Sequence, residues 1–201
     1  VRRSNGYLAN TYDNAPGQVQ YDVETATAAS GGGNGAIEVV HLTTRGSQYL
    51  GETGNLAGVT NTTTVTITGG SLSADDCIVN SDIYFTSGDA SGEGGTITDY
   101  NGTTKVVTYS PATTAASSTD GYAIGPKVVI SGDGQGANVR CTVNSTGGIN
   151  ATAVIAGGNN YSNASISILS NASQSNSFNP SPTAVLTPII GPRGGHGSNA
   201  I

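Results

Sequence analysis

Short runs in which apolar and polar residues alternate recur along most of the chain, and clusters of glycine or asparagine separate them. An alternation with a period of two is typical of strands that bury one face, and these runs are rich in Val, Ile and Thr. Helical spacing is almost absent, because the longer windows without Gly or Pro consist mostly of Thr, Ser and Val, which are poor helix formers. The predicted strands lie at 18–25, 36–44, 62–69, 82–88, 95–100, 105–110, 126–132, 137–144, 149–157 and 164–170. We therefore expect an all-β protein made of antiparallel, β-sandwich-like units.

One hairpin is predicted together with the conformation of its turn. Asn101-Gly102 stands between two β-rich runs in the segment GTITDYNGTTKVVTY. An Asn-Gly pair adopts the positive φ angles of a type I′ turn more readily than most pairs. We expect a hairpin here, with a loop of about two to four residues.

A faint internal repeat suggests how the predicted strands are grouped. The order Tyr-x3-Pro, strand, Gly-x-Gly-Ala, strand, Gly-x2-Tyr begins at Tyr12 and again at Tyr122. Its central turns are GNGA at 33–36 and GQGA at 134–137, where glycine allows a tight turn and the small alanine starts the next strand. The hairpin lies between the two copies. The expected units are a first β unit at 1–60, an inserted β-hairpin module at 61–121 and a second β unit at 122–201.

Composition and charge narrow the possible functions. Charged residues make up only 10% of the chain, and the formal net charge is −6. Lys and Arg are scattered, so the basic stripe of a nucleic-acid-binding protein is missing and we expect no nucleic-acid partner. No apolar run has the length of a membrane span, so we expect no membrane partner. The chain begins with Val1, and we expect its ends to have been cut from a longer polypeptide.

The residues that could carry chemistry do not form a known constellation. The Gly-rich turns are followed by strands, whereas a phosphate-binding loop requires a helix after it. Cys77 and Cys141 lie in apolar runs and are interpreted as two buried free thiols. His41 alternates with apolar residues and is interpreted as one position on a strand face, and no Gly-x-Ser-x-Gly elbow occurs. We therefore expect no catalytic residue, no cofactor and no enzymatic activity.

Two acidic stretches leave metal binding open. SADDCI contains Asp75 and Asp76, and TSGDASGEGG contains Asp89 and Glu93. Calcium requires six to eight oxygen ligands, and neither stretch has the spacing of a known calcium loop. Solvated turns are the expected role of these residues, and the prediction includes no metal ligand.

The end of the chain carries the most specific motif. In TPIIGPRGGHGSNAI, the residues Pro192, Gly194, Gly195, His196 and Gly197 form a Pro-x-Gly-Gly-His-Gly pattern. Glycines around one histidine let the backbone lie close to another surface. This motif resembles a signature of the baseplate wedge subunit family of contractile-tailed bacteriophages, especially the long versions from cyanobacterial viruses. The segment VNSDIYFTSGDASGEGGTITDYNGTTKVVTYSPATT is similar to a β module common in phage virion proteins.

The resemblance implies a structural virion protein that acts by contact. It implies an all-β wedge component in the phage tail baseplate, with other tail proteins and a second copy of itself as partners, and with no catalysis. The five residues of the closing motif would then form a structural or interface loop; an ordinary surface loop is the alternative. Two other functions stay open from the residues themselves: a tail fibre that binds host-surface glycans, and a secreted bacterial adhesin.

Overall fold

The fold is known from a computed structural model, which describes residues 35–169 and 183–191. These residues contain strands, turns and bends but no helix, and every strand ladder is antiparallel. Accordingly, this part of the chain holds no helical segment with the length and apolar character to cross a bilayer. The strands are β1 (Ile37–Thr44), β2 (Glu52–Asn61), β3 (Thr64–Ile67), β4 (Asp82–Phe85), β5 (Gly94–Asn101), β6 (Val106–Ser110), β7 (Gly121–Gly125), β8 (Val128–Gly132), β9 (Gln135–Val143), β10 (Ile149–Asn159), β11 (Ala164–Ile168) and β12 (Val185–Ile190). The predicted all-β, antiparallel class is confirmed.

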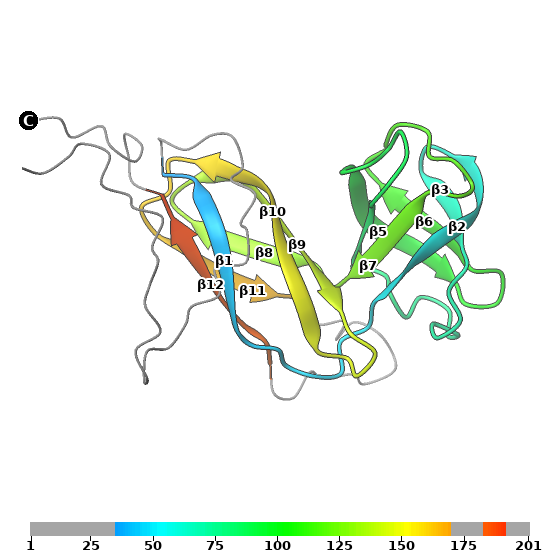
Figure 1. Ribbon diagram of the computed structural model, residues 1–201, viewed down its shortest axis with the longest axis horizontal. Helices are drawn as coiled ribbons and strands as arrows, with labels where there is room; N and C mark the ends of the chain where they lie inside the picture. The colour runs from blue at the N-terminus through cyan, green and yellow to red at the C-terminus, as the bar shows by residue number, and fades with distance from the viewer. Residues whose placement is uncertain (1–34, 170–182, 192–201) are drawn as a thin grey trace, which may run out of the picture.

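The middle of the chain forms a closed barrel, which we call the barrel. Its strands follow one another in the order β2-β3-β6-β5-β4-β7 (Figure 1). Alternate residues point inward, as the period of two requires: Val65 and Ile67 of β3 are buried, as are Ile83 and Phe85 of β4. Buried tyrosines take the place of larger aromatics in this core, and the Tyr100 hydroxyl donates a hydrogen bond to the Leu72 carbonyl at 2.6 Å.

The other six described strands form a second unit, which we call the ring. Contacts between strands place them in the cyclic order β9-β10-β1-β12-β11-β8, and β8 and β9 close the circle (Figure 1). Hydrogen-bonded ladders join β9 to β10, β1 to β12 and β8 to β11. The neighbouring pairs β10–β1, β12–β11 and β8–β9 form no ladder in the described residues, and we call each of these places a seam. The core inside the ring contains Ile37, Val139, Tyr161 and Leu186.

The barrel is inserted into the ring between β1 and β8. It runs from Glu52 to Gly125, whereas the predicted module ran from 61 to 121. The predicted limits therefore fall on the last residue of β2 and the first residue of β7. The sequence prediction contained no strand at β2, because Gly54 and Gly58 interrupt the alternation. It also missed the short, glycine-bounded β7 and β12, which contains a proline.

The predicted hairpin is formed by β5 and β6, but its turn is not of type I′. The amide of Lys105 donates to the Asn101 carbonyl at 2.8 Å, which closes a four-residue loop. The positive φ lies at Lys105, at 60°, and neither Asn101 nor Gly102 has one. The Asn101 side chain accepts hydrogen bonds from the amides of Thr103 and Thr104, at 3.0 and 2.8 Å. This side-chain turn fixes the loop and replaces the positive φ angles that the pair was expected to adopt.

Tertiary packing explains why glycine nonetheless stands at position 102. A Cβ atom there would overlap the backbone of Ser73, and the Gly102 amide donates to the Asp75 carboxylate at 2.7 Å. The glycine thus permits close approach of the segment that carries Asp75, and only the folded barrel makes this requirement visible.

Candidate functional site

The residues predicted for the interface loop lie outside the described part of the chain. They are Pro192, Gly194, Gly195, His196 and Gly197. The last described residue before them, Gly191, is buried and donates its amide to the Ala36 carbonyl at 2.8 Å. The chain therefore leaves the ring beside the start of β1, and the role of the closing motif stays a prediction.

The candidate acidic residues are held in turns of the barrel. Asp75 accepts the Gly102 amide, and Asp76 accepts the Tyr100 amide at 3.3 Å. Glu93 accepts both the amide and the hydroxyl of Thr114, at 2.6 and 2.7 Å, and these hydrogen bonds lower the pKa of Glu93. Asp89 is exposed in the turn after β4. Within 35–169 and 183–191 these four residues belong to no group of three or more potential metal ligands.

The cysteines and His41 occupy the structural positions that the sequence predicts. Cys77 and Cys141 are both free and buried, which confirms their interpretation. Burial raises the pKa of the Cys141 thiol to about 12, so it stays protonated at neutral pH and lacks the thiolate that reactivity requires. His41 is an exposed residue of β1 and lies opposite Thr187 of β12.

The outside of the β1–β12 pair carries aliphatic side chains together with a histidine and a threonine. We call it the ribbon face and define it as Val39, His41, Val185, Thr187 and Ile189. Val185 and Ile189 are 49% and 50% exposed, and Val39 lies opposite Ile189 in the register. Val40, Leu42, Leu186 and Ile190 of the same two strands pack in the ring core. Sequence reasoning missed this surface because it placed no strand at β12, although Val185, Thr187 and Ile189 have the spacing of one strand face.

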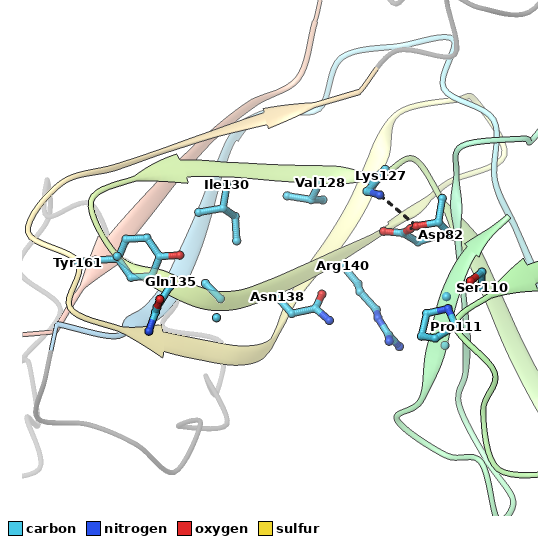
Figure 2. A pocket seen from close by; sticks show the side chains of 16 residues that line it. Asp82, Ser110, Pro111, Lys127, Val128, Ile130, Gln135, Asn138, Arg140 and Tyr161 are labelled. Atoms are coloured by element: carbon cyan, nitrogen blue, oxygen red, sulfur yellow. Dashed lines mark hydrogen bonds between the residues drawn. The ribbon is translucent and has the colours of Figure 1, made fainter. Parts of the chain in front are cut away.

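A cleft lies where the barrel meets the ring, and we call it the junction cleft. Its volume is about 540 Å³. Figure 2 shows Asp82, Ser110 and Pro111 on the barrel side. On the ring side, β8 contributes Val128 and Ile130, and β9 contributes Gln135, Asn138 and Arg140.

A chain of three polar side chains crosses the junction cleft. The Lys127 ammonium donates to the Thr96 hydroxyl at 3.1 Å, and that hydroxyl donates to the Asp82 carboxylate at 2.9 Å. Asp82 and Thr96 face each other in the register of β4 and β5, so the pairing of these two strands holds the carboxylate and the hydroxyl on the same surface. Burial raises the pKa of Asp82; the Thr96 hydrogen bond and the charges of Lys127 and Arg140 oppose this effect without cancelling it.

Arg140 ties the ring to the barrel. Its guanidinium donates to the carbonyls of Gly92 and Glu93, at 3.2 Å each, and lies 4.9 Å from the centre of the Tyr84 ring. The side chain starts on β9 of the ring, and all three of these partners belong to the barrel. Arg140 is only 7% exposed, so these contacts form with little access to water.

The backbone makes the junction tight. A Cβ atom on Gly125, at the end of β7, would overlap the Cys141 carbonyl, and one on Gly51 would lie 2.8 Å from a methyl group of Val143. The Tyr49 amide also donates to the Gly147 carbonyl at 2.9 Å. Both connections between the units therefore pack directly on the β9–β10 hairpin. The arrangement favours two units fixed to each other over a hinged pair.

Replacing Asp82 with asparagine should flatten the dependence of stability on pH. Because the folded protein raises the pKa of Asp82, it binds the proton more tightly than the unfolded chain does. Stability therefore falls as the pH rises above about 4 and through the raised pKa. Asparagine keeps an acceptor for Thr96 and removes the titration, so urea unfolding between pH 4 and 7 should lose this component. An unchanged pH profile in Asp82→Asn would contradict the assigned burial effect, and Asp99→Asn, in the exposed part of β5, is the control.

Comparisons with known proteins add no relative to these observations. No protein-family model matches the chain, and neither a curated protein nor a solved structure is significantly similar to it.

Proposed function

We propose that this chain is a structural protein of a phage tail, a baseplate wedge component of the virion that assembles through protein–protein contacts. The observation that carries the proposal is the ribbon face, a surface of an all-β protein on which large aliphatic side chains are exposed. Val185 and Ile189, each about half exposed, stand on the same side of β12. Val39 lies opposite Ile189 in the register, so exposed aliphatic side chains gather on one side of the strand pair. A cluster of this kind marks an interaction site more often than single exposed residues do.

The physical basis is the burial of apolar area. Each Å² of apolar surface removed from water contributes about 25 cal/mol, so covering both side chains favours association. Like-charged partners repel one another, and the chain carries a net charge of −6. The ribbon face contains no Asp, Glu, Lys or Arg, which makes it suitable for contact with another acidic protein or with a second copy.

The assignment to a phage baseplate is supported by the two sequence resemblances. The segment that is similar to the virion module forms β4, β5 and β6, three neighbouring strands of the barrel. The closing motif follows β12, the strand that carries most of the ribbon face. The most specific motif and the exposed surface therefore adjoin each other in the sequence.

Charged substitutions on the ribbon face should abolish assembly without unfolding the protein. In the double variant Val185→Lys, Ile189→Lys, two ammonium groups would have to be buried in the contact, which is strongly unfavourable. We expect the wild-type chain to form a homodimer in size-exclusion chromatography with light scattering and to bind purified tail baseplates. The double variant should be a monomer that does not bind them, while its far-ultraviolet circular dichroism spectrum stays that of the folded wild type.

The matched control is Ile155→Lys, which changes an exposed residue of β10 outside the ribbon face. It should keep the wild-type mass and baseplate binding. A wild-type chain that is monomeric, ignores baseplates and binds a bacterial surface polysaccharide would overturn the proposal in favour of a tail fibre or an adhesin.

A further inference from the structure

We propose that the junction cleft accepts an extended segment of a partner protein, in which apolar and acidic residues alternate, as an added strand between β8 and β9. The inference rests on the proposed role in assembly only for the identity of the protein that supplies the segment. The strand-accepting site itself is argued from the geometry of the cleft.

The first observation is the seam between β8 and β9. These strands are consecutive and are joined through Asp133 and Gly134, yet no ladder connects them in the described residues. β8 forms its ladder with β11, and β9 forms its ladder with β10. The second edge of β8 and the second edge of β9 therefore border the seam. A strand edge of this kind can pair with an extended peptide through backbone hydrogen bonds.

The second observation is that both strands are anchored away from the seam. At the closed end, the Asp133 carboxylate accepts the amides of Ser162 and Asn163, at 2.9 and 3.0 Å. At the open end, Lys127 is bonded to Thr96 and Arg140 to the loop after β4, so two different parts of the barrel hold β8 and β9. The separation of the strands is therefore built into the fold.

The lining of the cleft matches an alternating strand. Val128 and Ile130 provide apolar surface, while Lys127 and Arg140 provide positive charge (Figure 2). Successive side chains of an extended segment point to opposite sides. One set would pack in the seam against Val128 and Ile130, and the other would face the two cations. β8 has five residues, so the segment needs about five residues, or roughly 17 Å of extended chain.

The charge of the cleft selects an acidic segment. The whole chain has only 7 Lys and Arg residues against 13 Asp and Glu residues, and two of those cations line this cleft. Among the described residues that line the cleft, Asp82 is the only one with a carboxylate, and its burial favours the neutral form. A carboxylate on the added strand would gain charge-assisted hydrogen bonds from the donors of Lys127 and Arg140 that remain.

The lining fits a peptide better than a sugar. Carbohydrate sites usually offer an exposed aromatic face for stacking. The aromatic side chain here, Tyr161, is only 4% exposed and packs against Gly134. The free backbone edges of β8 and β9 are suited to another backbone, which a sugar lacks.

The test begins with selection of randomised heptapeptides on the full-length chain. We expect enriched peptides in which apolar and acidic residues alternate. The best peptide, labelled with fluorescein, should lose at least tenfold in affinity by anisotropy when alternate backbone amides are N-methylated, and also when its acidic residues are replaced by lysine. On binding, the amides of β8 and β9 should gain protection in hydrogen exchange.

Two protein variants locate the site. Asn138→Trp would fill the cleft from its exposed position on β9, and Lys127→Gln removes a charge but keeps a donor for Thr96. Each should weaken peptide binding at least tenfold. Asn55→Trp, at an exposed position on the barrel, is the matched control and should bind like the wild type, and urea unfolding verifies that all three variants are folded.

Selected peptides without an acidic bias would overturn the inference, and so would peptide binding that Asn138→Trp leaves unchanged. Saturable binding of an oligogalacturonate in place of peptides would also overturn it, because that result would indicate a site for acidic sugars. The ribbon-face double variant separates this test from that of the proposed function. It should keep peptide binding, and Asn138→Trp should keep self-association. Either proposal can therefore fail while the other stands.

Discussion

Replacing Gly125 with alanine is expected to lower the free energy of unfolding by about 3 kcal/mol, the upper end of the typical range for an overpacked site. Gly125 ends β7 and is buried against the backbone of β9. The added methyl group would overlap the carbonyl oxygen of Cys141. Because the obstacle is backbone in a strand, no side-chain rotation can relieve it, and either β7 or β9 must shift. The φ of Gly125 is not positive, so the effect is steric and does not arise from backbone strain.

Urea unfolding followed by tyrosine fluorescence measures this effect, since the chain has nine Tyr and no Trp. Gly70→Ala is the matched control, because a Cβ atom there would meet nothing within 4 Å. It should change the free energy of unfolding by less than about 1 kcal/mol. If Gly125→Ala unfolded at the same urea concentration as Gly70→Ala, the close approach of the two units at this point would be contradicted.

Replacing Arg140 with methionine is expected to lower the free energy of unfolding by about 2 kcal/mol. Methionine keeps much of the apolar stem but loses the two hydrogen bonds from the guanidinium and its contact with the Tyr84 ring. Hydrogen bonds from charged groups contribute about 1.5–3 kcal/mol each, and a cation over an aromatic ring about 0.5–2 kcal/mol. Because Gly92 is exposed, water can replace part of the lost hydrogen bonding to its carbonyl. The expected loss of stability is therefore well below the sum of these separate contributions.

The matched variant for this position is Arg140→Lys. Both hydrogen bonds come from one guanidinium nitrogen, Nη1. Lysine keeps a positive charge, but its shorter side chain does not carry the ammonium as far as Nη1, so it should recover only part of the loss. Differential scanning calorimetry adds a second readout. Because Arg140 links the ring to the barrel, Arg140→Met should broaden or split the melting transition. A wild-type melting curve in both variants would show that Arg140 does not couple the two units.

The sequence predicts some features because they depend on neighbours along the chain. The alternation of β3, β4 and β6 follows from one buried face per strand, and the burial of the two cysteines follows from the apolar runs around them. The hairpin of β5 and β6 is equally local. Its turn is not, because Gly102 is selected by contact with Ser73 and the positive φ moves to Lys105.

The candidate surfaces could not be read from the sequence for the same reason. The ribbon face requires β12 to pair with β1, which is more than 140 positions away, as in the pairing of Ile37 with Ile190. The junction cleft requires β4 and β5 of the barrel to face β8 and β9 of the ring. Long-range pairs of this kind leave no periodic signal, since each partner satisfies only its own local pattern.

The amino-acid sequence by itself determined that this protein is all-β, because period-two alternation and β-branched residues are properties of short segments. Tertiary structure alone decided that the central strands close into a barrel, that the described strands of the ring meet without a ladder at the seams, and that Arg140 and Gly125 hold the two units together. The reason is physical: strand formation depends on which residues alternate, whereas barrel closure, seams and clefts depend on which distant strands meet.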